Sequence, residues 1–249
     1  MCTPLNSAQL QHLIDFIGYG RLDAPVWFIG MEEGGGGAAN INARLNFQPV
    51  EDLRHAHVNL LKIPQFHYNN LRTNTPIIQP TWDGMCRIML GLHGISINPP
   101  AIRNYQADCL GRDNASTMLC ELMPIPCPNM NVWPQEYQDL FPQYPTKKDY
   151  YDDVMPKRIK AITQLIKQYE PKIVICYGAG YWIHYKKLFP NFPSFSQPPG
   201  FVGFEAAQFN NMIVILIPHF VAIPMNGYTV QQVATYIKQQ MPQLQLNAC

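Results

Sequence analysis

The sequence has little charge, no excess of either sign and no long apolar run. Only 14% of its 249 residues are charged, and 18 basic residues against 17 acidic ones leave a formal net charge of +1. A chain so balanced has no global basic field of the kind that indicates a nucleic-acid partner. No apolar run reaches the roughly 18 residues of a membrane-spanning helix. The N-terminus also lacks a basic stretch followed by an apolar one. We therefore expect neither a membrane span nor a signal peptide.

The cysteines show no spacing typical of a metal site or of a disulfide framework. None of the seven forms a C-x-x-C pair; they are Cys2, Cys86, Cys109, Cys120, Cys127, Cys176 and Cys249. We therefore expect no zinc or iron–sulfur centre, no disulfide framework and no cofactor. A reducing cytoplasm is the expected compartment.

What the sequence does contain is enough apolar residues for one large core. Hydrophobic residues make up 47% of the chain, and its length suits one domain with elaborated loops. No internal repeat and no linker divides it. We predict a single domain over residues 1–249, with long proline-rich loops, and expect it to be a monomer.

Four short apolar runs have the length and composition of buried parallel strands. They lie at 26–29, 116–123, 173–177 and 212–217. Proline cannot continue a central ladder, so Pro124 and Pro126 are expected to end the second run. Helical segments alternate with the strands, at 7–17, 51–61, 82–92, 154–169, 178–188 and 229–240. This alternation predicts an α/β protein, with three α/β/α layers around a central four-stranded, mainly parallel sheet.

Chemically capable residues follow the ends of these strands. Glu32 and Glu33 come with four glycines after the first strand, and Glu121 lies at the end of the second. The turn Gly178-Ala179-Gly180 follows the third strand and His219 follows the fourth. In an open α/β sheet, ligands bind beyond the carboxyl ends of the strands. We therefore expect these groups to meet at one edge of the sheet.

In this order the strand ends resemble the motifs of the uracil-DNA glycosylase superfamily, over residues 24–235. Gly30-Met31-Glu32-Glu33-Gly34 occupies the place of the first motif, which holds a catalytic acid or amide. Glu121 stands where the family has an asparagine that binds the flipped uracil. Tyr177-Gly178-Ala179 matches a turn that touches DNA phosphate, and Pro218-His219-Phe220-Val221 matches a His-Pro-Ser motif after the last strand.

The resemblance implies a fold like that of uracil-DNA glycosylase and a site for a base turned out of DNA. A carboxylate there would stabilise positive charge on the sugar or polarise a water, and an imidazole would stabilise the leaving base. The implied catalytic residues are Glu32, Glu33 and His219; the base-binding residues are Phe47, Glu121 and Met31; and the DNA-binding residues are Gly178, Ala179, Gly180 and Ile223. Only one of the two adjacent glutamates is expected to act on the sugar, with Glu32 the first choice.

The sequence departs from the family's motifs in ways that favour a base other than uracil. Glu33 takes the place of the usual proline, Phe220-Val221 replaces Pro-Ser, and the iron–sulfur cysteines of some branches are missing. An ionised Glu121 only accepts hydrogen bonds, which suits the exocyclic amine of cytosine, and a protonated one can also donate to cytosine N3. We therefore predict a DNA glycosylase for a modified cytosine, such as a hypermodified phage base attacked in antiviral defence. Its substrate is double- or single-stranded DNA.

Other functions stay open at this point. The chain could be a uracil-excising repair enzyme, a non-catalytic DNA- or protein-binding relative, or a nucleotide-binding Rossmann-like protein. In the last case Gly34–Gly37 would cradle a phosphate, although this loop fits neither the dinucleotide nor the P-loop pattern. A local basic patch or a solvated helix face would each account for the positively charged residues Lys147, Lys148, Lys157, Arg158 and Lys160.

Overall fold

The computed structural model describes residues 3–60, 77–222 and 227–246. In this part of the chain, one sheet of seven strands has the order β3-β1-β4-β2-β5-β7-β6. The strands are β1 (Gly18–Gly20), β2 (Val26–Gly34), β3 (Val50–Glu51), β4 (Thr117–Cys127), β5 (Ile173–Tyr177), β6 (Glu205–Phe209) and β7 (Met212–Ile217). The neighbours β4, β2, β5 and β7 run parallel, and they contain the four predicted apolar runs.

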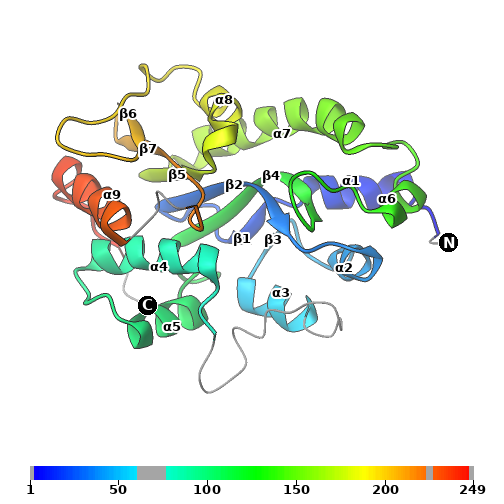
Figure 1. The fold of residues 1–249 in the computed structure, drawn as a ribbon, viewed down its shortest axis with the longest axis horizontal. Coiled ribbons are helices and arrows are strands. Elements are labelled where there is room, and N and C mark those ends of the chain that lie inside the picture. The colour runs from blue at the N-terminus through cyan, green and yellow to red at the C-terminus, as the bar shows by residue number, and fades with distance from the viewer. Residues whose placement is uncertain (1–2, 61–76, 223–226, 247–249) are drawn as a thin grey trace.

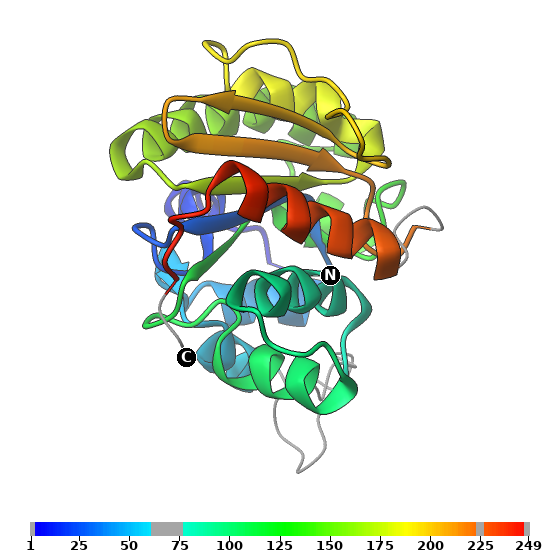
Figure 2. The ribbon, with the colours of Figure 1, turned by 90° about the vertical axis from the view of Figure 1, so that its left-hand side faces the viewer.

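Helices cover both faces of this sheet (Figure 1). One layer is formed by α3 (Leu53–Leu60), α4 (Pro80–His93), α5 (Pro99–Asp108) and α9 (Gly227–Gln240). The other is formed by α1 (Ser7–Asp15), α6 (Gln135–Leu140), α7 (Lys147–Tyr169) and α8 (Trp182–Tyr185). The short helix α2 (Ala38–Arg44) follows β2, and the 3₁₀ turns η1 (Ala179–Tyr181) and η2 (Lys186–Leu188) flank α8. Figure 2 shows α9 lying across the sheet, beside α4, with α5 on the far side of α4.

The three-layer α/β/α prediction agrees with this arrangement, but the predicted four-stranded sheet is wrong. The sheet is mixed and seven-stranded, because β1 adds antiparallel to β4, β3 adds parallel to β1, and β6 adds antiparallel to β7. The sequence gives no apolar run for these additions. Strand β1 has three residues and β3 has two, while β6 carries the polar sequence EAAQF.

Two central strands run past their predicted ends. Strand β2 continues through Glu32 and Glu33, and β4 continues past Pro124 and Pro126. The pairing of β1 with β4 ends at Cys120, so a proline nitrogen that cannot donate leaves no β1 carbonyl without its partner. The two glutamates are therefore fixed by strand backbone rather than carried on a flexible loop.

The strands alternate between two apolar cores. Val26 and Phe28 face the layer of α3, α4, α5 and α9, whereas Trp27 and Ile29 face the layer of α1 and α7. All four are fully buried. Burial on both faces explains why the parallel strands are continuous apolar runs rather than alternating ones.

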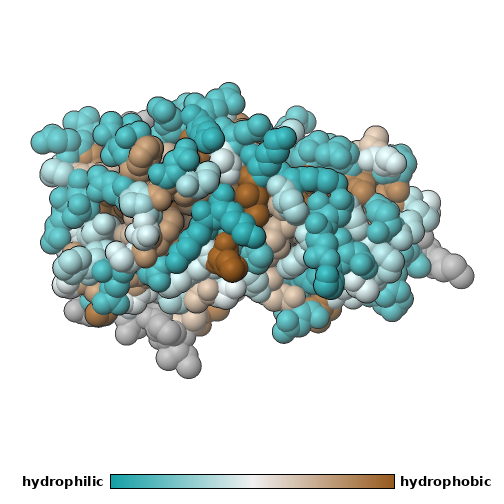
Figure 3. All heavy atoms as spheres, turned by 90° about the horizontal axis from the view of Figure 1, so that it is seen from above, coloured by the Kyte–Doolittle hydropathy of each residue, from teal (hydrophilic) through white to brown (hydrophobic). Residues whose placement is uncertain are grey.

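The outer face of α7 is hydrophilic. Figure 3 views the molecule from the side of this helix, and hydrophobic atoms show there only in separated spots. Two ion pairs one turn apart lie on this helix, Lys148 with Asp152 and Lys157 with Asp153. The helix begins with a capping box, in which Thr146 and Asp149 satisfy each other's backbone N–H groups.

Arg158 lies on the inner face of α7 and is 2% exposed. Its guanidinium donates to three backbone carbonyls, those of Ile14 at 3.1 Å, Glu121 at 2.9 Å and Leu122 at 3.2 Å. One side chain thus ties the end of α1 and the centre of β4 to α7.

The cysteines agree only in part with expectation. Cys109 is disulfide-bonded, which the cysteine spacing does not predict. Cys86, Cys120, Cys127 and Cys176 are free and buried, so they pack as small apolar side chains in the core.

Replacing Arg158 tests this link. We expect Arg158→Met to lower the free energy of unfolding by about 2–4 kcal/mol, because three charge-assisted hydrogen bonds are lost while one buried charge is removed. Urea denaturation measures the change. The adjacent Lys157→Met is the control, since Lys157 is 64% exposed and a surface substitution changes stability by about 0.5 kcal/mol or less. Equal stability of the two variants would contradict the role given to Arg158.

Candidate functional site

A cavity of about 780 Å³ opens at the carboxyl ends of the parallel strands. We name it the strand-end cavity. It is lined by Glu32 and Glu33 from β2, Glu121 from β4, the turn Gly178–Gly180 after β5, and His219 after β7. The four strand ends therefore meet around one hollow, at the edge of an α/β sheet where ligands bind.

The structure brings most of the sequence-predicted residues together. The predicted residues that line the strand-end cavity are Met31, Glu32, Glu33, Glu121, Gly178, Ala179, Gly180 and His219. The prediction for Phe47 is wrong, because its ring is 2% exposed and packs in the core against Phe16 and the Arg44 guanidinium. Ile223 lies outside the described residues.

Glu32 is locked in place by α7. Its Oε1 accepts from Lys147 Nζ at 2.6 Å and its Oε2 accepts from the Tyr151 hydroxyl at 2.8 Å. The side chain is 2% exposed. Burial raises the pKa of Glu32 above its ordinary value, and the contacts with Lys147 and Tyr151 offset this only in part.

Glu33 is held at one oxygen and remains more open. Its Oε2 accepts from the Tyr19 hydroxyl at 2.8 Å and lies 2.8 Å from Arg44 Nη2. Arg44 is buried, and its Nε donates to Asn40 Oδ1 at 2.7 Å. Burial alone would lower the pKa of Arg44, but Glu33 and Tyr19 together outweigh it and the pKa is raised. The Glu33 side chain is 25% exposed.

Glu121 lies opposite a glycine. Gly30 of β2 pairs in register with Glu121, and a Cβ at Gly30 would stand 2.2 Å from Glu121 Oε2 and 2.3 Å from the Tyr177 hydroxyl. This gap lets Tyr177 on β5 donate to Glu121 Oε1 on β4 at 2.6 Å, across the intervening strand. Burial raises the pKa of Glu121 to about 8.

His219 is a neutral donor beside this pair. Its ring lies 5.6 Å from the Tyr177 ring, edge to face. The backbone N–H of Val221 points at Nδ1, at 3.4 Å, which assigns the proton to Nε2. Burial lowers the pKa of His219, so the imidazole is neutral at pH 7.

The strand-end cavity extends away from the acids into an apolar compartment under α3 and α4. We name it the α3–α4 compartment; its lining residues are Leu53, Ala56, Leu60, Trp82 and Met85. Polar side chains are present as well, since His57, Gln79 and Thr81 also line the cavity. The site therefore combines a charged end with an apolar, aromatic end.

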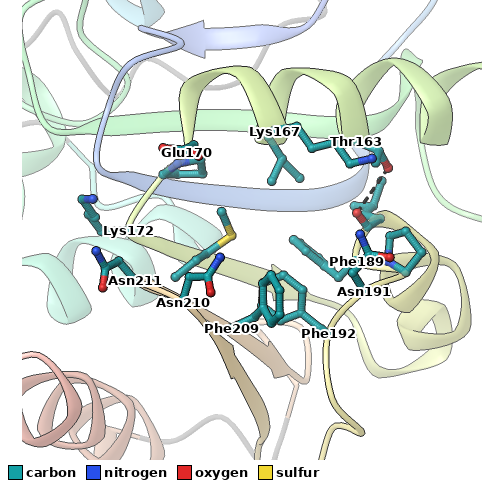
Figure 4. A pocket seen from close by; sticks show the side chains of 15 residues that line it. Thr163, Lys167, Glu170, Lys172, Phe189, Asn191, Phe192, Phe209, Asn210 and Asn211 are labelled. Carbon is teal, nitrogen blue, oxygen red and sulfur yellow. Dashed lines mark hydrogen bonds between the residues drawn. The ribbon is translucent and has the colours of Figure 1, made fainter.

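A second hollow, of about 390 Å³, lies at the opposite edge of the sheet. Figure 4 shows Lys167 and Glu170 from the end of α7 across the hollow from Asn210 and Asn211, which come from the turn between β6 and β7. Lys172, which also lines it, directly precedes β5. None of the predicted site residues within the described chain lines this hollow, so the chemistry gathers at the strand-end cavity.

The basic run on α7 is largely compensated. Lys147 pairs with Glu32, Lys148 with Asp152 and Lys157 with Asp153, while Arg158 is buried. These residues therefore form a helix face whose charges are mostly paired and in part buried, rather than a basic patch free to bind DNA.

Sequence reasoning missed the side chains that hold the carboxylates, namely Tyr19, Arg44, Lys147, Tyr151 and Tyr177. Tyr177 left a signal, because it is the last residue of a predicted strand. The others come from segments distant from the glutamates in sequence, and their spacing says nothing about the contact.

Over the described ranges, no group of three or more His, Cys, Asp or Glu side chains is placed to hold a metal ion. The same part of the chain has no helix with the length and apolarity needed to cross a membrane. The chain matches no protein-family model, and no curated protein matches its sequence.

Gly30→Ala tests the geometry of the Tyr177–Glu121 pair. The added methyl group would overlap both side chains, so we expect a loss of about 1–3 kcal/mol in the free energy of unfolding, as for an overpacked core. Gly34→Ala is the matched control on the same strand, since a Cβ there meets nothing within 4 Å. Chemical denaturation compares the two. A Gly30→Ala protein as stable as Gly34→Ala would show that the gap is not needed.

Proposed function

We propose that this chain is a DNA glycosylase that hydrolyses the N-glycosidic bond of a base turned out of DNA, and that the base is a modified cytosine. The product is DNA with an abasic site. One observation carries the proposal: acids from β2 and β4 and an imidazole after β7 line one cavity at the strand ends.

The chemistry requires a carboxylate near the sugar. As the bond between C1′ and the base nitrogen breaks, its electron pair leaves with the base and positive charge builds on the sugar. Water then forms the new bond to C1′ and gives up a proton. A carboxylate beside C1′ stabilises the positive charge and can accept that proton.

Glu33 fits this role better than Glu32. Both oxygens of Glu32 already accept hydrogen bonds, and only 2% of its side chain is exposed. Glu33 is 25% exposed, and Tyr19 and Arg44 both contact it at Oε2. Glu33 therefore serves as the group that faces the sugar, while Glu32 anchors the end of β2 to α7.

His219 suits the leaving base. Negative charge develops on the base carbonyl beside the breaking bond, and a neutral imidazole can donate Nε2–H to that oxygen without adding a full charge. Burial lowers the pKa of His219, which favours this neutral donor over the imidazolium.

The size of the cavity supports a base with a substituent. A ligand pocket commonly measures about 300–1,000 Å³, and the strand-end cavity, at about 780 Å³, is roomy for one pyrimidine. The α3–α4 compartment would take the substituent, against Trp82. A modified phage base, removed in antiviral defence, is a substrate of this kind.

Carboxamide variants separate the two glutamates. We expect Glu33→Gln to slow base release by about 10²–10³-fold, the effect of losing one group that stabilises transition-state charge. Glu32→Gln removes the ion-pair partner of the largely buried Lys147, which then keeps only the backbone carbonyls of Asn129 and Val132. Breaking such a pair costs about 3–5 kcal/mol of stability, and we expect a smaller loss of rate in the folded protein. Abasic-site formation on genomic DNAs with different natural cytosine modifications measures the rates.

The opposite order of the two losses would return the role to Glu32. Unchanged rates in both variants would contradict the catalytic assignment. Release of uracil alone from matched duplexes would contradict the cytosine substrate.

Trp82→Ala tests the α3–α4 compartment. We expect KM for DNA with a bulky cytosine substituent to rise about tenfold to a hundredfold, the equivalent of losing one aromatic stacking contact. The same protein on unsubstituted cytosine is the control and should change little. An equal effect on both substrates would place Trp82 outside the substituent site.

A further inference from the structure

The three carboxyl groups of the strand-end cavity are not held alike. Glu32 pairs with Lys147 and Glu33 pairs with Arg44. Glu121 has no ion pair among the described residues and accepts only the Tyr177 hydroxyl, at Oε1. Its Oε2 is buried without a hydrogen-bond partner in the described structure. A buried carboxylate with no cation is costly, and the usual escape is to take up a proton.

The surroundings of Glu121 oppose a negative charge. The hydroxyl of Tyr177, from β5, favours the ionised form, and so does Arg44 from α2, but burial outweighs both and Glu33 and Glu32 of β2 add repulsion. The other nearby titratable or charged groups are Cys120 of β4, Tyr185 of α8, Arg158 of α7 and His219 after β7, whose ring packs on Tyr177. Arg158 donates to the backbone carbonyl of Glu121, not to its carboxyl group.

We infer that Glu121 works as a neutral carboxylic acid, with its proton fixed on Oε2 by Tyr177, and that it donates this proton in a hydrogen bond to the bound base. The inference rests on the proposed function for the identity of the ligand. The tyrosine is a positioning residue, since a hydroxyl that donates to Oε1 marks that oxygen as the carbonyl-type acceptor and leaves Oε2 as the donor.

A carboxylic acid with a fixed proton presents one donor and one acceptor side by side. Cytosine offers the complement, an acceptor at N3 beside the exocyclic amine donor. Uracil offers the reverse order, a donor at N3 beside an acceptor at O4. For a base held in one orientation, the acid therefore matches cytosine, with Oε2–H facing N3 and Oε1 facing the exocyclic amine. Tyr177 thus helps to set base specificity without a catalytic role.

Glu121→Gln is the decisive variant, because its amide copies the neutral acid: a carbonyl for Tyr177 and a donor in place of Oε2–H. In the wild type, affinity for cytosine-containing DNA should fall about tenfold per pH unit once pH exceeds the pKa of Glu121. The Glu121→Gln protein should lack this pH dependence, whatever its affinity below that pH. Titration of His219 does not contribute to this fall in affinity, since burial lowers the pKa of His219.

Two readouts need no DNA. Between pH 4.5, the ordinary carboxyl pKa, and about pH 8, Glu121 keeps its proton in the native state but has lost it in the unfolded state. The free energy of unfolding of the wild type should therefore fall as pH rises through this window. Glu121→Gln should lack that component of the slope. The infrared carbonyl band of a protonated carboxylic acid should be present at pH 7 in the wild type and absent from Glu121→Gln.

Tyr177→Phe tests the fixed proton. Without the hydroxyl, either oxygen of Glu121 can carry the proton, so discrimination between cytosine-type and uracil-type bases should fall about tenfold, the equivalent of one hydrogen bond. Unchanged discrimination would overturn the positioning role.

The failures of the two proposals can be told apart. A wild type with no infrared band and the same pH slope as Glu121→Gln overturns the neutral acid, even if base release is observed. The band and slope without any base release uphold the neutral acid and remove the cytosine assignment together with the glycosylase.

Discussion

The hydrogen bond from Tyr177 to Glu121 is the contact on which the strand-end cavity depends. Neighbouring strands lie about 4.8 Å apart, so residues on β4 and β5 meet across β2 only where the residue between them has no side chain. Gly30 supplies that gap, in register with Glu121. The same tyrosine carries His219 against its ring. One glycine thereby fixes the wall of the cavity that a base would face.

This chain has few charged residues, and two of the three carboxyl groups in the site are paired with a cation. Lys147 reaches Glu32 from the start of α7, and Arg44 reaches Glu33 from the end of α2. Glu121 has no cationic partner in the described structure and accepts a hydrogen bond from the Tyr177 hydroxyl. Its carboxyl group can be buried in this way because it can take up a proton and become neutral. Three acids can therefore share one hollow without three negative charges, and the open side of Glu33 remains for a ligand.

The sequence predicts the parts of this molecule that local pattern controls. Four apolar runs locate β2, β4, β5 and β7, because strands buried on both faces must be apolar throughout. Strand β1 is too short to leave such a signal. Pro124 does not end β4, because β1 no longer pairs with β4 at that position. The acids and His219 converge as predicted, since parallel strands end at one edge. The prediction for Phe47 is wrong because spacing along the chain does not show which side of a loop packs inward.

The most direct test of the central claim is a crystal structure of the Glu33→Gln protein with DNA that contains a substituted 5-hydroxymethylcytosine. We predict the base inside the strand-end cavity, with its N3 edge at Glu121, its sugar at residue 33 and its substituent under α3 and α4. DNA bound elsewhere, with the base still stacked and the cavity holding only water, would contradict it.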